Sequence, residues 1–324
     1  PEAIRAKDRT RLIERLTEEQ FVRPGPRGGE RGRLRSVRSK PLRVRVTEVA
    51  TAPPWLSEAD DRAALLGQGN ILIHGTTHAI NAIITGQTAR TAFFTTKGHP
   101  DILVIREGSR TDFFNFRPYP DPYIPRSLTY EVPERIDDRG GVHEALDERA
   151  VQDIIKELRR EKVEAVGVCL LWSILNPLHE NRVGALLDAH LPGVPYTLSH
   201  QLNPSLREYR RASSTCIDAS LKPLMGAYLG SLDRRLREAG FEGRALVVTT
   251  QGGAMDAADM AAAPIHAINS GPAMAPIAGR AYAQKECGTG TAIIADTGGT
   301  PRAVWRSVTS ATATYGQPRV CAAA

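Results

Sequence analysis

The residues best suited to chemistry form one glycine-rich turn, Asp296, Thr297, Gly298, Gly299 and Thr300. This turn directly follows the apolar run 291–295, which is typical of a β-strand. Two adjacent glycines, which lack Cβ, allow backbone N–H groups to approach a phosphate closely. The Asp296 carboxylate could hold Mg²⁺, directly or through water, and the threonine hydroxyls could donate to phosphate oxygens. The pattern predicts a phosphate-binding turn, with a plain turn between two strands as the alternative.

Three further glycine turns carry polar residues that could face a ligand. The first follows the apolar run 70–74 and could contact a substrate. Its candidate residues are His74, Gly75, Thr76, Thr77 and Asn81. The other two turns contain Gly252, Gly253, Ser270 and Gly271. Ligands of open α/β sheets bind beyond the carboxyl ends of the strands, so four strand-end turns in one chain predict a nucleotide cleft.

Two other groups of polar residues are weaker candidates for metal or substrate binding. His74 and His78 flank a strand–helix junction without a clear third ligand, so the sequence favours a substrate-facing turn or a structural junction over a zinc site. Arg106 opens the charged loop 106–112, which could contact a polar substrate or form a solvated face. The chain shows no nucleophile elbow, P-loop or HExxH motif, which argues against a serine hydrolase, a P-loop enzyme and a zincin.

The elements that must position these turns alternate between strands and helices. Apolar runs predict strands over 70–74, 91–96, 165–172, 244–250 and 291–295. Helical spacing follows most of these runs, and Asp147 and Asn176-Pro177 are suited to helix starts. A long helix is expected over 206–240, kinked or split at Pro223. Alternation of this kind predicts an α/β fold with a largely parallel or mixed sheet.

The net charge of +6 is concentrated at the N-terminal end of the chain. Residues 1–47 carry a net charge of +8, and the remainder carries −2. The arginine-rich segment 31–40 could bind nucleic acid or a membrane surface. Because no aromatic platform or known reader fold accompanies it, we favour a disordered or mistranslated arm and expect no nucleic-acid partner.

Cysteine usage and hydropathy place the chain in a broad class. The four cysteines are far apart and form no CxxC pair, which indicates buried thiols rather than disulfides or a zinc framework. No apolar run reaches the roughly 18–20 residues of a membrane helix, and no secretory signal is visible. We expect a cytoplasmic protein with no membrane partner.

Several longer segments resemble one family. The segment HGTTHAINAI at 74–83 resembles the N-terminal region of the hydantoinase/oxoprolinase family. Further segments with this resemblance lie at 91–103, 123–137, 167–183, 206–219, 251–255, 270–274 and 293–299. They keep a consistent order over roughly residues 70–300, which is far more specific than any single motif. The family includes N-methylhydantoinases, 5-oxoprolinases, caprolactamase subunits, and acetone and acetophenone carboxylase subunits.

The resemblance implies a fold and a chemistry. It implies an actin-like ATPase fold of the sugar-kinase and Hsp70 type, with ATP and Mg²⁺ held by two phosphate turns, of which Asp296–Thr300 matches the second. It also implies phosphorylation of a carbonyl or enol oxygen of the substrate. A partner hydrolase or carboxylase subunit would then complete the reaction. The small-molecule substrate would be a cyclic amide.

Both ends of the chain depart from the family pattern. Residues 1–69 lack a first phosphate turn of the DIGGT type, and residues 301–324 do not continue the second lobe. We interpret this as truncated or frameshifted reading of a longer gene, with a fold incomplete at both ends. The expected division is an atypical basic segment 1–69, an N-terminal α/β domain 70–204, the start of an ATPase-type domain 205–300, and an atypical tail 301–324.

Three hypotheses follow. The first is a subunit of an ATP-dependent hydrolase that opens a hydantoin or a 5-oxoproline-like ring, inactive alone if truncated. The second is a subunit of an ATP-dependent ketone carboxylase. The third is a non-catalytic remnant or binding module.

Overall fold

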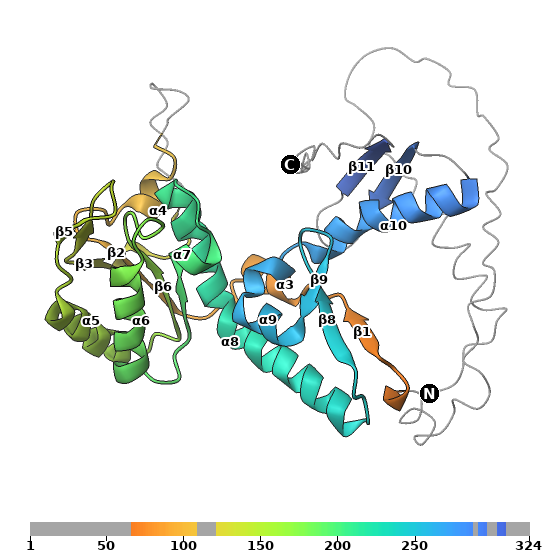
Figure 1. The fold of residues 1–324 in the computed structure, drawn as a ribbon, viewed down its shortest axis with the longest axis horizontal. Helices are drawn as coiled ribbons and strands as arrows, with labels where there is room; N and C mark the ends of the chain where they lie inside the picture. Colours follow the sequence, from red (N-terminus) through yellow and green to blue (C-terminus); the bar gives the residue numbers. More distant parts are fainter. Residues whose placement is uncertain (1–65, 109–120, 288–290, 297–302, 309–324) are drawn as a thin grey trace, which may run out of the picture. The chain divides into compact units, whose positions relative to one another are not determined.

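The computed structural model describes residues 66–108, 121–287, 291–296 and 303–308 (Figure 1). All of these residues belong to the unit Pro54–Ala324. Residues 1–65 of the predicted basic segment, and the predicted tail apart from 303–308, lie outside the described residues. Within the described part, no helix is long and apolar enough to cross a membrane.

The first sheet is a four-stranded parallel sheet in the order β3-β2-β6-β7. Its strands are β2 (Thr91–Thr96), β3 (Thr129–Val132), β6 (Ala165–Cys169) and β7 (Tyr196–Leu198). Every residue of the two central strands, β2 and β6, is buried. Parallel strands covered on both faces read as continuous apolar runs, which explains sequences such as AVGVC. The prediction of parallel strands here is confirmed.

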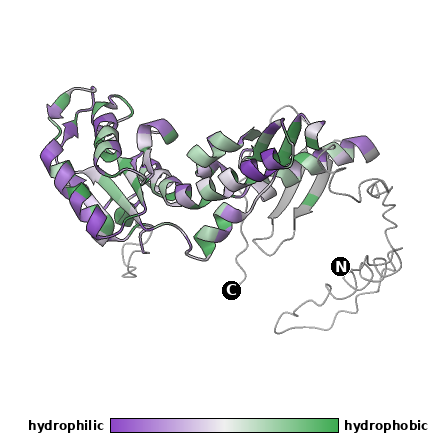
Figure 2. Ribbon diagram, turned by 90° about the horizontal axis from the view of Figure 1, so that it is seen from below, coloured by the Kyte–Doolittle hydropathy of each residue, from purple (hydrophilic) through white to green (hydrophobic). Residues whose placement is uncertain are grey.

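Helices complete this core. The helices are α4 (Ile102–Ile105), α5 (Glu148–Arg160), α6 (Leu178–His190) and α7 (Ser199–Leu202), with the 3-10 helix η2 (Arg126–Leu128). As predicted, Asp147 starts α5, because its Oδ1 accepts hydrogen bonds from the N–H groups of Arg149 and Ala150, at 3.0 Å each. Val151, Ile155 and Leu158 are buried at helical spacing. The outer face of α5, at the left of Figure 2, is hydrophilic.

A two-stranded antiparallel ribbon lies beyond β3 in the chain. It pairs β4 (Arg135–Ile136) with β5 (Val142–Glu144). The Asp137 carboxylate accepts the N–H groups of Arg139 and Gly141 in the connecting turn, at 2.9 and 2.7 Å. These two hydrogen bonds hold the pKa of Asp137 below its usual value.

The second sheet is mixed and has the order β1-β8-β9. Strands β1 (Ile71–His74) and β8 (Arg244–Val248) run parallel, and β9 (Ala254–Asp256) pairs antiparallel with β8. The elements α3 (His78–Ile84), α9 (Ala257–Ala262) and η3 (Pro264–Ala267) follow these strands. A second hydrophobic cluster, which includes Ala79, Leu221, Met225, Val247 and Met260, forms the core of this region.

One helix contributes to both cores. It is α8 (Glu208–Glu238), which spans 31 residues with Pro223 inside it. Ala212 and Cys216 belong to the first core, and Leu221, Met225 and Leu229 belong to the second. Of the predicted kink or split at Pro223, the split is wrong, since the helix continues through the proline. Pro223 cannot donate a helical hydrogen bond, but burial of its neighbours Leu221 and Met225 keeps the helix continuous.

The C-terminal elements are α10 (Ser270–Cys287) and the hairpin of β10 (Thr291–Asp296) with β11 (Ala303–Val308). The two strands pair antiparallel from Thr291↔Val308 to Asp296↔Ala303. A Cβ built on Gly279 of α10 would clash with Ile294 Cγ1, so this glycine allows close packing of helix and strand.

Two other boundary predictions need correction. The strand predicted over 165–172 ends at Cys169, because Leu170–Trp172 turn away to meet buried polar groups. Ser270 and Gly271 do not follow a strand. They form the first turn of α10, after the 3-10 helix η3.

The thiols of the first core fit the cysteine prediction. Within the described residues, Cys169 and Cys216 are free and buried. Burial raises the pKa of Cys169 to about 12 and raises the pKa of Cys216 as well. Both are therefore protonated, unreactive thiols at neutral pH.

Candidate functional site

The structure brings three of the predicted glycine turns together. Parallel pairing of β1 with β8 puts their carboxyl ends, His74 and Val248, at the same edge of the sheet. The Ser270 hydroxyl donates to the backbone oxygen of Thr76 at 3.2 Å, which ties the start of α10 to the turn after β1. The Thr250 N–H donates to the His266 oxygen at 2.7 Å, which ties the turn after β8 to η3. We call these three turns, of which two follow strands and one follows η3, the strand-end turns.

The glycines of these turns differ in what surrounds them. A Cβ built on Gly75 or on Gly271 would meet no atom within 4 Å. Gly252, in the β8–β9 hairpin, has φ +80°, and its Cβ would lie 3.7 Å from the Ala273 oxygen in the first turn of α10. Gly75 and Gly271 therefore leave room for a ligand, whereas Gly252 is required by backbone conformation.

Several polar groups of the turn after β1 have internal partners. Thr76 Oγ1 accepts the His78 N–H at 3.1 Å, and Asn81 Nδ2 donates to Thr77 Oγ1 at 3.2 Å. His74 Nε2 lies 2.7 Å from the Tyr228 hydroxyl, and the ring of His78 lies 4.8 Å from the Tyr228 ring. The two histidines thus contact one tyrosine, and no group of three metal-ligating side chains occurs among the described residues.

Free donors remain at these turns. The backbone N–H groups of Thr76, Thr77 and Gln251 make no hydrogen bond to another residue in the described part of the chain. Unpaired backbone N–H groups beside glycines with open space suit a phosphate. The residues present at the strand-end turns therefore fit the phosphate groups of a nucleotide.

The fourth predicted turn, Asp296–Thr300, begins at the end of β10. Asp296 is the last residue of β10, and Thr297, Gly298, Gly299 and Thr300 lie outside the described residues. The structure places the backbone of Asp296 opposite Ala303 in the hairpin.

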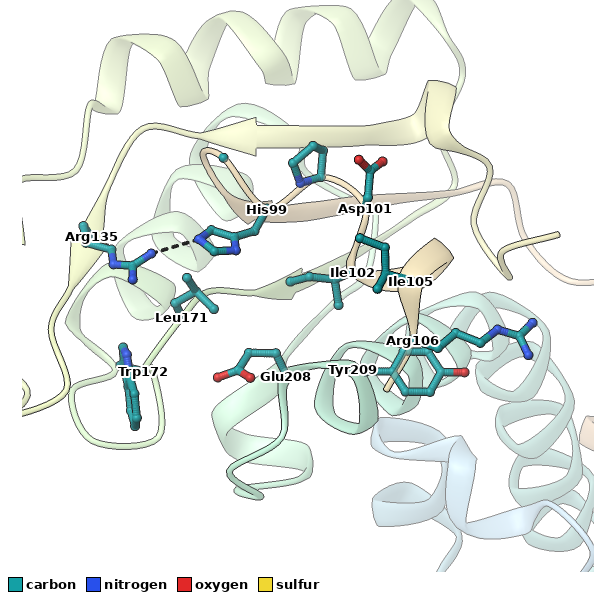
Figure 3. A pocket seen from close by; sticks show the side chains of 12 residues that line it. His99, Asp101, Ile102, Ile105, Arg106, Arg135, Leu171, Trp172, Glu208 and Tyr209 are labelled. Carbon is teal, nitrogen blue, oxygen red and sulfur yellow. Dashed lines mark hydrogen bonds between the residues drawn. The ribbon is translucent and has the colours of Figure 1, made fainter. Parts of the chain in front are cut away.

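A cavity of about 440 Å³ lies at the carboxyl end of the parallel sheet (Figure 3). The segment after β2 contributes Gly98–Asp101, and the segment after β6 contributes Leu171 and Trp172. The other lining residues are Ile102, Ile105, Arg106, Arg135, Glu208 and Tyr209. We call this the sheet-end cavity. Its position beyond the strand ends is where open α/β sheets bind ligands.

Arg106, which the sequence offered as a contact for a polar substrate, lines the sheet-end cavity. It ends α4 with φ 60°, and its guanidinium points away from His99 and Arg135 in Figure 3. Sequence reasoning missed the other polar residues of this cavity. The available signal was that His99 and Trp172 follow an apolar strand within a few residues.

Buried polar groups support the wall of the cavity. Glu180, fully buried, accepts the Leu170 N–H at 2.8 Å, the Ser199 hydroxyl at 2.5 Å and the His200 N–H at 3.1 Å. Arg211, also fully buried, donates to the Leu170 oxygen at 2.9 Å. The Leu171 N–H donates to Thr96 Oγ1 at 2.9 Å. The backbone before Trp172 is therefore held by three buried side chains.

A second buried pair extends this network. Thr96 donates its hydroxyl hydrogen to Glu134, and the other Glu134 oxygen lies 2.7 Å from His179 Nδ1. Trp172 itself has φ 58°, a conformation that costs a bulky residue about 1–3 kcal/mol and persists only where the surroundings fix it. The buried hydrogen-bond network described above fixes the backbone next to Trp172.

Comparison with known proteins agrees with this α/β architecture. A family model described as the hydantoinase/oxoprolinase N-terminal region matches residues 56–191, and one described as hydantoinase/oxoprolinase matches residues 211–315. The chain belongs to the hydantoinase/oxoprolinase family.

Individual relatives fall within the same family. The caprolactamase subunit alpha of Pseudomonas jessenii is 36% identical over 241 residues, which cover 74% of this chain and 34% of the relative. The acetophenone carboxylase gamma subunit of Aromatoleum aromaticum is 32% identical over 250 residues, covering 73% and 34%. The crystal structure of the ATP-dependent caprolactamase from Pseudomonas jessenii superposes with a TM-score of 0.67 at 35% identity, covering 75% of this chain and 36% of that one. The chain thus spans about one third of the length of these relatives.

Proposed function

We propose that this chain forms part of an ATP-dependent hydrolase subunit that opens a cyclic amide, of the hydantoin or 5-oxoproline type, by phosphorylating its carbonyl oxygen. The observation that carries the proposal is the convergence of the strand-end turns, with open space at Gly75 and Gly271 and with backbone N–H groups that have no partner among the described residues. The similarity to an ATP-dependent caprolactamase supports it.

The proposal assigns roles to the residues of the turns. The N–H groups of Thr76, Thr77 and Gln251 would orient phosphate oxygens, and Gly252, Gly253, Ser270 and Gly271 would shape the nucleotide side of the site. ATP would supply the phosphoryl group that turns the amide oxygen into a better leaving group. Asp296 would hold Mg²⁺, and Thr297–Thr300 would bind phosphate, in an actin-like ATPase architecture.

The division of the chain is part of the same proposal. Residues 70–204 would form the N-terminal α/β domain, and residues 205–300 would begin the ATPase-type domain. A partner hydrolase subunit would complete ring opening. The charge developing on the phosphoryl oxygens would be stabilised by fixed donors, which is the main source of catalysis in phosphoryl transfer.

A ketone carboxylase is the second candidate, supported by the 32% identity to an acetophenone carboxylase subunit. There the phosphorylated atom would be the enol oxygen of a ketone. ATP hydrolysis that depends on bicarbonate and a ketone would select this candidate. ATP-dependent turnover of hydantoin or 5-oxoproline in the presence of the partner subunit would select the hydrolase.

Calorimetric titration with Mg-ATP tests the nucleotide site itself. We expect Gly75→Ala to weaken ATP binding at least tenfold, because the added methyl group enters the space left for phosphate. Gly230→Ala is the matched control: Gly230 is exposed on α8 and its Cβ also meets open space. Asp296→Ala should weaken Mg-ATP binding. Wild-type protein that gives no heat would support the third reading, a non-catalytic remnant, and unchanged affinity in Asp296→Ala would remove Asp296 from the site.

A further inference from the structure

We propose that the sheet-end cavity is a second ligand site, which binds a small planar organic carboxylate that also carries an N–H group. The cavity is lined by groups of three kinds: cations at Arg106 and Arg135, an aromatic and apolar wall, and carboxylates at Asp101 and Glu208. A volume of about 440 Å³ lies at the small end of the range for small-molecule sites, about 300–1,000 Å³.

Arg135 is the anion-binding group of the cavity. It is half-buried in β4, and its Nη1 donates to His99 Nε2 at 3.0 Å (Figure 3). In the described part of the chain this is its single hydrogen bond, and it forms no ion pair there. A guanidinium carries five N–H donors, so most of its donors are free for a ligand. Their fork geometry suits a carboxylate bound through both oxygens.

His99 orients the guanidinium of Arg135. Because a guanidinium only donates hydrogen bonds, Nε2 of His99 is the acceptor in this contact. The bond fixes the guanidinium beside Leu171 and Trp172, as Figure 3 shows. Asp101, another acid that lines the cavity, is paired with Arg126 at 3.2 Å. Arg135 therefore faces a ligand without a competing partner from Asp101.

The apolar wall selects a flat ligand body. Trp172 and Tyr209 are half-buried and line the cavity with Ile102 and Leu171. Trp172 is held in its positive-φ conformation by the buried Glu180, Arg211 and Thr96 side chains. A side chain fixed in this way offers a preformed surface for a planar ring.

Glu208 adds the requirement for an N–H donor. Its carboxylate points toward Trp172 in Figure 3 and makes no ion pair or hydrogen bond with a described side chain. A half-buried carboxylate gains most from a ligand donor when water is displaced. A ring N–H would satisfy it while the ligand carboxylate pairs with Arg135.

This site is independent of the proposed nucleotide site, because none of its lining residues belongs to the strand-end turns. The two proposals can therefore fail separately. The Asp296→Ala variant should lose Mg-ATP binding and keep carboxylate binding. Loss of the carboxylate alone would leave the nucleotide proposal intact.

Three probes of equal size test the chemistry on the full chain: pyrrole-2-carboxylate, its uncharged analogue pyrrole-2-carboxamide, and furan-2-carboxylate, which lacks the N–H. Binding is followed by tryptophan fluorescence, with Trp172→Phe to assign the signal. We expect saturable binding of pyrrole-2-carboxylate and at least tenfold weaker binding of the other two.

Substitutions then assign the contacts. Arg135→Gln should weaken pyrrole-2-carboxylate about ten- to a hundredfold, as expected for a lost charge-assisted pair. Arg139→Gln, an exposed arginine in the adjoining turn, is the control and should bind as wild type. Glu208→Gln should weaken the pyrrole probe and leave the furan probe unchanged. If Arg135→Gln does not fold, Arg135→Lys, which keeps the charge and loses the fork, should still bind more weakly than wild type.

Other results would overturn the proposal. Equal binding of the carboxylate and the carboxamide would show that charge has no role. Wild-type affinity in Arg135→Gln, or in Arg135→Lys where that variant is used, would remove the anion anchor. Absence of any carboxylate binding at millimolar concentration would show that the cavity is not a site for this class of ligand.

Discussion

The parallel sheet and the mixed sheet use apolar strands in different surroundings. In the parallel sheet, all six residues of β2 are buried. In the mixed sheet, β1 has the apolar sequence ILIH, yet Ile71 and Ile73 are 60% and 66% exposed. Successive side chains of a strand point to opposite faces, so β1 is covered on one face only. An apolar run followed by a glycine turn therefore identifies a strand, but it does not show whether one face or both faces of that strand are buried.

The same contrast applies to the sites. The strand-end turns lie beside an edge strand, β1, and consist mainly of backbone groups. The sheet-end cavity lies beside two fully buried strands and consists of side chains supported by buried acids and an arginine. The first arrangement suits a ligand with many oxygens, and the second suits a ligand with distinct charged and flat parts.

The largest expected effect tests the covering of the two sheets. Phe94→Ala, in β2, should lower the free energy of unfolding by about 3–5 kcal/mol, because it leaves a cavity in a closed core. Ile73→Ala, in β1, should change it by less than about 0.5 kcal/mol. Urea unfolding measures both. Equal losses would show that β1 is covered as fully as β2.

The buried acid under the sheet-end cavity gives the next largest effect. Glu180→Gln keeps the shape of the side chain but directs an amide donor at N–H and O–H donors. We expect a loss of about 1–3 kcal/mol in stability. The same variant should weaken ligand binding at Trp172 and leave Mg-ATP binding unchanged. An equal loss of both ligands would mean that the two regions are coupled more tightly than their contacts suggest.

A smaller effect is expected in the hairpin of the mixed sheet. Gly252→Ala should cost roughly 1–2 kcal/mol, because φ is +80° there. Its built Cβ is also close to Ile277 Cδ1, but that atom ends a flexible side chain and can move. Gly253→Ala is the control in the same turn, since its Cβ would lie 3.6 Å from Thr249 Oγ1 and its φ is not positive. Thermal unfolding should separate the two variants.

The smallest effect on stability is expected at a surface ion pair of the parallel-sheet region. Arg182 Nη2 lies 2.7 Å from Glu148 Oε2, and this pairing holds the pKa of Glu148 below its ordinary value. An acid whose pKa is lowered in the folded state stabilises the fold at pH values above its ordinary pKa. That stabilisation is lost as the pH falls through the lowered pKa. Arg182→Ala should therefore be slightly less stable than wild type at pH 7, and the two proteins should have the same stability in acid. Lys156→Ala, at a more exposed pair, should show no difference at either pH.

Much of the fold could be predicted from the sequence, because local signals agree with it. Asp147 caps α5 as its side chain dictates, and the apolar runs at 91–96 and 165–169 are buried strands. Pro223 shows the limit of such reasoning. Its helix-breaking tendency is intrinsic, but packing of its neighbours against the second core outweighs it.

The candidate site was only partly predictable. Local patterns identified the glycine turns, since glycine and threonine after an apolar run are adjacent in sequence. The sheet-end cavity joins His99, Arg135, Trp172 and Glu208, which are far apart in the chain. Their meeting depends on the strand order β3-β2-β6-β7, which no local pattern contains. The burial of Glu180 and Arg211 was equally hidden, because charged residues in helices usually face water.

The shared helix α8 has a consequence for how its amide hydrogens exchange with solvent. Its first half is protected only while the core around Ala212 and Cys216 is intact, and its second half only while the core around Met225 and Leu229 is intact. The change from one core to the other lies between Cys216 and Leu221, one turn before Pro223. Amide exchange along this one helix therefore reports the opening of each core separately.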